Sequence, residues 1–132
     1  RLCTKLTSSY LEAAIRIAGA RPGPEGLLVA ASGLCGPAVE LVLRTGVDPG
    51  YADTAGYTAL HHAAVGVRYG DWERGVRTAR LLLSLGAPAG ARNRHNDTAG
   101  AMVREAVRAL EGGDDGQAEA LEDLADELES RE

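Results

Sequence analysis

An internal repeat is the feature that most constrains the fold of this 132-residue chain. The doublets Ala30-Ala31 and Ala63-Ala64 lie 33 residues apart, and an apolar triplet and then a glycine follow each doublet. In the second unit the triplet and glycine come seven residues later than in the first. Units of this kind stack on one another and bury a continuous core between neighbours. The spacing therefore predicts a solenoid.

Each unit predicts two short helices joined by a turn. Pro37 can start the second helix of the first unit, because the first helical position needs no backbone donor. Gly46 and Gly86 follow the apolar stripes of the two units, where a left-handed residue commonly ends a helix. The connecting segments VDPGYADTAGY and APAGARNRHND are rich in turn residues, so we expect hairpin-like loops.

The two ends of the chain predict caps for the stack. Ser9 and Glu12 have capping-box spacing at the start of SYLEAAIRIAGA, which predicts a helix. At the other end, Thr98 can cap one helix, and Asp114 and Gln117 can cap a last helix with an acidic outer face. Terminal repeats need a polar outer face, and the last helix supplies one.

The second unit resembles the ankyrin repeat family. DTAGYTALHHAAVG, followed by RLLLSLGAPAGARN, is similar to the family pattern D-x-x-G-x-T-P-L-H-x-A-A and x-L-L-L-x-x-G-A-x-x-N. Ala59 stands at the usual Pro, and the unit at Thr98 keeps only the Thr. The resemblance implies an all-α fold, an ankyrin-repeat solenoid of helix-turn-helix units joined by hairpin-like loops. A C-terminal acidic amphipathic helix completes it.

Spacing and resemblance together divide the chain into four parts. The second repeat carries an insertion, residues 67–77, which we expect to lengthen the turn between its two helices. The parts are an N-terminal capping half-repeat (1–24), ankyrin repeat 1 (25–56), ankyrin repeat 2 (57–96), and a degenerate C-terminal repeat with its acidic capping helix (97–132).

The adjacent His61 and His62 raise the question of a metal or catalytic site. They lie about 100° apart around a helix, whereas helical metal sites use histidines four residues apart. In the ankyrin pattern, Thr58 and His61 tie the helix start to the neighbouring loop, and the resemblance implies that role here. The sequence has no phosphate loop or nucleophile elbow. We therefore expect no enzyme activity, no cofactor and no metal.

Stacked repeats usually bind partners on their concave side. Tyrosine and arginine are enriched in binding hot spots, and an arginine-rich tip favours an acidic or phosphorylated partner segment. Trp72, in the insertion, is a second candidate contact unless it folds back over the helix ends. By resemblance, the candidates on hairpin tips and first helices are Ala52, Thr54, Ala55, Tyr57, Val65, Arg92, Arg94, His95, Asp97 and Glu105.

The net charge of −5 is unevenly distributed. Residues 1–110 contain 13 basic and 9 acidic residues, whereas residues 111–132 contain one Arg and 10 acidic residues. We predict a non-catalytic protein-protein interaction scaffold or adaptor. One alternative is self-association or autoregulation through the acidic C-terminal helix. Another is nucleic-acid binding through the arginine-rich tips, against which the acidic tail argues.

The cysteine count and hydropathy bear on location. Two cysteines, Cys3 and Cys35, do not make a disulfide framework, and we expect reduced thiols and an intracellular site in cytoplasm or nucleus. No apolar run approaches the roughly 20 residues of a membrane span, so we expect no membrane partner.

Overall fold

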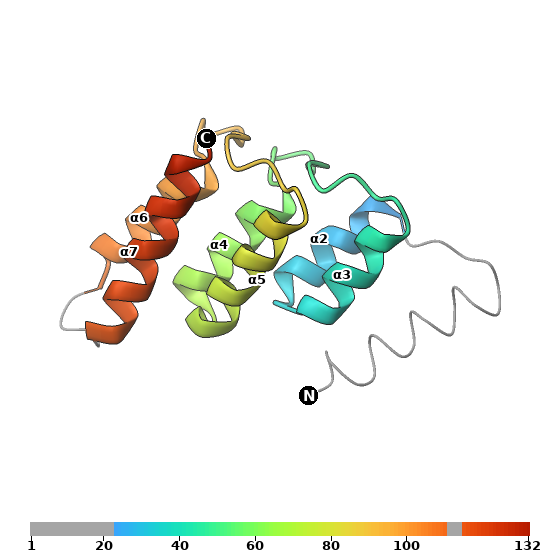
Figure 1. Cartoon of the computed structure of the whole chain (residues 1–132). Helices are drawn as coiled ribbons and strands as arrows, with labels where there is room; N and C mark the ends of the chain where they lie inside the picture. The colour runs from blue at the N-terminus through green and yellow to red at the C-terminus, as the bar shows by residue number, and fades with distance from the viewer. Residues whose placement is uncertain (1–22, 111–114) are drawn as a thin grey trace.

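The computed structural model describes residues 23–110 and 115–132, and within them it contains six α-helices and no strand (Figure 1). The all-α prediction is confirmed. The predicted helix near Ser9 and the predicted cap Asp114 lie outside the described residues. The helices are α2 (Pro24–Ser32), α3 (Gly36–Arg44), α4 (Ala59–Tyr69), α5 (Trp72–Ser84), α6 (Ala99–Arg108) and α7 (Asp115–Ser130).

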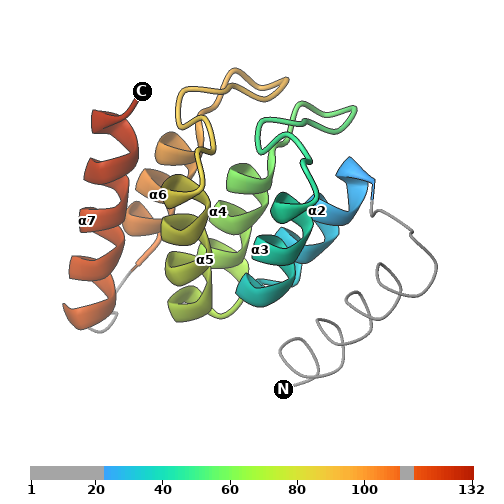
Figure 2. The same ribbon diagram turned by 45° about the vertical axis from the view of Figure 1, so that its right-hand side comes forward.

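The helices form three pairs that stack side by side in two rows (Figure 2). We call α2, α4 and α6 the inner row and α3, α5 and α7 the outer row. Each pair packs internally, and each inner helix also packs against the next inner helix. Two connecting loops leave the same end of the stack, and their tips are residues 48–57 and 88–97 (Figure 1). We call these the first and second tips.

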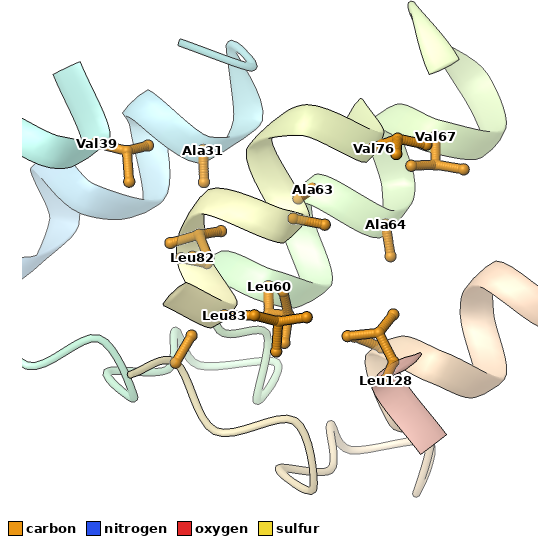
Figure 3. Packing of buried hydrophobic residues seen from close by; sticks show 14 of the residues in the cluster. Ala31, Val39, Leu60, Ala63, Ala64, Val67, Val76, Leu82, Leu83 and Leu128 are labelled. Carbon is orange, nitrogen blue, oxygen red and sulfur yellow. The ribbon is translucent and has the colours of Figure 1, made fainter. Parts of the chain in front are cut away.

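Small aliphatic residues let the helices approach closely (Figure 3). Ala31, Ala63 and Ala64 are almost fully buried between the rows, and Leu60 and Leu82 fill the space around them. Burial of a Leu side chain stabilises a fold by about 1.5–3 kcal/mol. The hydrophobic core therefore runs through the three helix pairs and fixes the positions of the two tips relative to each other.

The extra residues of the second unit lengthen the helices and leave the turn short, which corrects the expectation for residues 67–77. Only Gly70 and Asp71 separate α4 from α5. Val67 and Val76, both buried, continue the apolar stripes of their helices. A Cβ on Gly75 would lie 2.8 Å from the Val67 nitrogen, so the two helix ends pack backbone to backbone. Burial of these stripes favours helix over loop.

The prediction of reduced thiols is wrong. The Cys35 sulfur is disulfide-bonded. The thiols therefore give no support to an intracellular location. Within residues 23–110 and 115–132, no helix combines the length and the apolarity that crossing a lipid bilayer requires.

Candidate functional site

The two tips share one hydrogen-bonding pattern. Asp53 Oδ1 accepts hydrogen bonds from the backbone N–H groups of Ala55 (2.9 Å) and Tyr57 (3.0 Å). In the second tip, Asn93 Oδ1 accepts from the N–H groups of His95 (2.9 Å) and Asp97 (3.1 Å). A side-chain oxygen two residues before its donor is a strong local turn former. Both tips are therefore held by their own sequence.

A direct contact joins the two tips. The Arg94 N–H donates to the Ala55 carbonyl at 3.0 Å. Gly56 has a φ of +80° there, and a Cβ on it would lie 2.9 Å from the Asn93 Cα. Arg92 Nη1 donates to the Asn96 carbonyl at 2.9 Å and so closes its own tip. The two tips form one continuous surface.

Thr58 and His61 connect the start of α4 to the second tip. Thr58 caps α4, and its backbone N–H donates to His61 Nδ1 at 3.1 Å. Because Nδ1 accepts, the proton of the neutral ring is on Nε2, which donates to the Asp97 carbonyl at 2.9 Å. Burial lowers the pKa of His61 and favours this uncharged form.

His62 also has a structural partner. Its Nε2 lies 3.1 Å from Asp53 Oδ2, and the Tyr57 ring packs at a tilt against the rings of both His61 and His62. Burial opposes ionisation of Asp53. The backbone N–H groups of Tyr57 and Ala55 and the side chain of His62 outweigh it and lower the pKa of Asp53. Across the described parts of the chain, no three His, Cys, Asp or Glu side chains converge as metal ligands.

A hollow of about 160 Å³ lies between α4 and α6, beneath the tips. Four predicted residues line it: Tyr57, Val65, Asp97 and Glu105. The other lining residues are Ala64, Arg68, Tyr69 and Met102. The hollow combines two aromatic rings, apolar side chains and charges of both signs.

Arg68 and Tyr69 form a wall of this hollow that the sequence analysis missed. Arg68 Nη1 lies 3.2 Å from Glu105 Oε2, and the guanidinium lies 5.0 Å from the centre of the Tyr69 ring. Tyr69 is 73% exposed. Their positions three and four residues after Val65 place them on the same helical face, and this spacing is the signal that could have found them.

The remaining predicted residues are not in the hollow. Ala52 and Thr54 are exposed on the first tip, and Arg94 and His95 are exposed on the second. Trp72 starts α5 at the end of the stack away from the tips, where it is partly buried and packs against the core. Trp72 thus covers apolar surface.

The acidic helix α7 lies against α6 and α5. Arg104 of α6 pairs with Asp126, at 2.8 Å, and with Glu129. Arg80 of α5 pairs with Glu127 at 2.5 Å. The carboxylates of α7 therefore meet arginines of neighbouring helices, and no ion pair with a tip arginine occurs in the described chain.

The ankyrin repeat family model matches residues 55–94, which span the end of the first tip, α4, α5 and most of the second tip. Residues 55–94 are therefore an ankyrin repeat. The matched ankyrin repeat contains Thr58 and His61 and one wall of the hollow. No curated protein matches this chain. Ankyrin repeats are a non-catalytic, protein-interaction fold.

Proposed function

We propose that this chain is an adaptor that holds a segment of a partner protein in the hollow between α4 and α6, beneath the joined tips. The observation that carries the proposal is the hollow's lining of Tyr57, Tyr69, Val65 and Met102. Aromatic residues and Met are enriched in the cores of protein interfaces. The hydrogen bonds that fix both tips support the proposal, because a preorganised surface loses less entropy on binding.

The charge of the second tip supports an acidic or phosphorylated partner segment. The Arg94 side chain is exposed, and its guanidinium makes no ion pair with a described residue. Arg92, in contrast, already donates to the Asn96 carbonyl. A guanidinium binds carboxylate and phosphate through paired hydrogen bonds. We assign the recognition of the partner's acidic group to Arg94.

Affinity capture with three baits tests the proposal. The wild-type chain is compared with a Tyr69→Ala/Arg94→Ala variant and with Arg44→Ala, a control on the outer row whose guanidinium pairs with Glu40. Both substituted residues are exposed, so the variant should keep its helical circular dichroism. We expect the control to retain the partner and the double variant to lose it. Capture of the same proteins by all three baits would contradict the proposal.

The two alternatives have less support from the described contacts. Five described arginines already pair with carboxylates, which reduces the positive charge open to nucleic acid: Arg44, Arg68, Arg80, Arg104 and Arg131. For autoregulation, α7 would have to cover the binding surface, yet it packs on α6 and α5. A salt titration of partner binding separates nucleic acid from protein, because phosphate contacts give steep salt dependence.

A further inference from the structure

A second hollow, of about 220 Å³, lies in the outer row between α3 and α5. It shares no lining residue with the hollow beneath the tips. Apolar side chains form most of its wall, and two guanidinium groups and one hydroxyl complete it. The lining residues are Leu34, Gly36, Pro37, Arg74, Arg77, Thr78 and Leu81.

The Thr78 hydroxyl is a buried polar group without a partner. Thr78 is only 3% exposed, and its Oγ1 makes no hydrogen bond with any described residue. A helical Thr ordinarily donates to the carbonyl four residues earlier, and buried polar groups are nearly always satisfied. An unsatisfied hydroxyl in the wall of a hollow is available for a hydrogen bond to a bound group.

The two arginines of the hollow are also without carboxylate partners. Arg74 Nη2 donates to the carbonyls of Leu34 (2.9 Å) and Gly33 (3.3 Å), which fixes this side chain against the α2–α3 turn. Arg77 makes only a long contact, 3.5 Å from its Nε to the Glu73 carbonyl. Arg80, one turn further along α5, pairs with Glu127 instead. Positive charge beside this hollow is thus left unneutralised by the described chain.

The N-terminus of α3 adds to the positive electrostatic potential beside this hollow. Gly36 is the first residue of α3, and no side chain caps this helix. The Gly36 N–H has no acceptor among the described residues. Helix N-termini favour anions because their first N–H groups are unpaired and the helix dipole is positive there. An anion in the hollow would therefore be favoured by Arg77, Thr78 and the helix start together.

We propose that this hollow binds the carboxyl-terminal residue of a polypeptide. The terminal carboxylate accepts hydrogen bonds from Arg77 and the Thr78 hydroxyl, and an apolar side chain packs against Leu34, Pro37 and Leu81. Pockets for drug-sized ligands measure roughly 300–1,000 Å³, so a hollow of about 220 Å³ suits a single residue better. The mixture of apolar wall and guanidinium matches such a residue and matches no neutral apolar ligand.

Calorimetric titration of the 132-residue chain with the peptide acetyl-Gly-Ser-Gly-Val-Leu tests this site. We expect the free acid to bind and the C-terminal amide to bind at least about tenfold more weakly, since a charge-assisted hydrogen bond contributes that much. Arg77→Gln should weaken binding of the free acid by a similar factor. Arg108→Gln, which removes another unpaired, exposed arginine, should leave it unchanged.

Thr78→Val separates a binding role from a structural one. The substitution removes a hydroxyl that has no partner, so the melting temperature should stay the same or rise while peptide affinity falls. Equal binding of acid and amide, or no shift of the Gly36 and Thr78 amide resonances on titration, would overturn the site. Octanoate that binds while the peptide does not would show that the ligand is a small apolar acid, and would overturn the peptide assignment.

Discussion

His61 joins α4 to the second tip through an uncharged ring. Its Nδ1 accepts from the Thr58 N–H while its Nε2 donates to the Asp97 carbonyl, and a protonated ring could not accept at Nδ1. The bond to Asp97 crosses from the second repeat to the second tip. The protonation state of a single buried side chain therefore bears on how firmly the tip is held.

Stability should fall as the pH falls through the range in which the unfolded His61 is protonated. The folded-state pKa of His61 lies below the ordinary value of about 6.5, so the unfolded chain binds the proton first. The contribution of His61 is present above pH of about 6.5 and is lost as the pH falls toward the folded-state pKa. We expect urea unfolding between pH 7 and 5 to show this slope.

A His61→Ala variant supplies the comparison. It should lose about 2–4 kcal/mol of stability, from the cavity and the missing hydrogen bonds. Its stability should then vary less over the same pH range. His62 and His95 remain in both proteins and serve as an internal reference. An equal pH slope in the two proteins would show that His61 does not control the transition.

A comparison of Gly56 with Gly46 separates two costs of adding a side chain, which are backbone strain and steric contact with the second tip. Both have a positive φ, +80° and +96°, in which an L side chain costs about 1–2 kcal/mol. A Cβ on Gly46 would meet nothing within 4 Å, whereas one on Gly56 would lie 2.9 Å from the Asn93 Cα. Gly56→Ala should therefore destabilise the chain by about 1–3 kcal/mol more than Gly46→Ala, by thermal unfolding. Equal losses would mean that the tips separate freely.

At the scale of the element, burial outweighs charge in attaching α7. Leu121, Leu124 and Leu128 are almost fully buried against the rest of the stack. Arg104 and its carboxylate partners lie at the surface, where ion pairs contribute roughly 0–1 kcal/mol. The acidic character of α7 therefore concerns its outer face, and its apolar stripe accounts for its position.

Leu124→Ala should cost about 2–5 kcal/mol, whereas Arg104→Gln should cost less than about 1 kcal/mol. Chemical denaturation in urea at low and at high salt measures both effects. We expect the small effect of Arg104→Gln to shrink further with salt, because screening weakens exposed charges. A larger loss of stability for Arg104→Gln than for Leu124→Ala would show that ion pairs, and not apolar burial, attach α7.

The helices also show what the sequence could and could not predict. The repeat spacing predicted the all-α solenoid, because apolar stripes and helix stops recur at fixed intervals along the chain. It failed at residues 67–77, because a count of inserted residues does not say whether they join a turn or a helix. The burial of Val67 and Val76 favours a helical conformation for these inserted residues. Placement of Arg68 and Tyr69 at the hollow follows from that extension.

For the molecule as a whole, the extensive contacts between described helices lie within a pair or between neighbouring pairs. The central pair, α4 and α5, has a pair on each side, whereas α2 and α3 pack against one described pair. In such a stack, stability is close to a sum of repeat and interface terms. Amide protection should therefore be highest in α4 and lower in α2. Hydrogen exchange by mass spectrometry measures it, and greatest protection in α7 would contradict the nearest-neighbour picture.

The residues of the two tips fall into two classes, which differ in how freely they can be substituted. Asp53, Gly56 and Asn93 maintain the backbone shape, so substitutions there alter the surface itself. Thr54 and His95 are exposed, and no side-chain hydrogen bond of theirs supports a tip. Variation at the second class can change which molecule is recognised at little cost to folding. The same molecule is therefore a scaffold on which new specificities can be selected from a library randomised at the exposed positions.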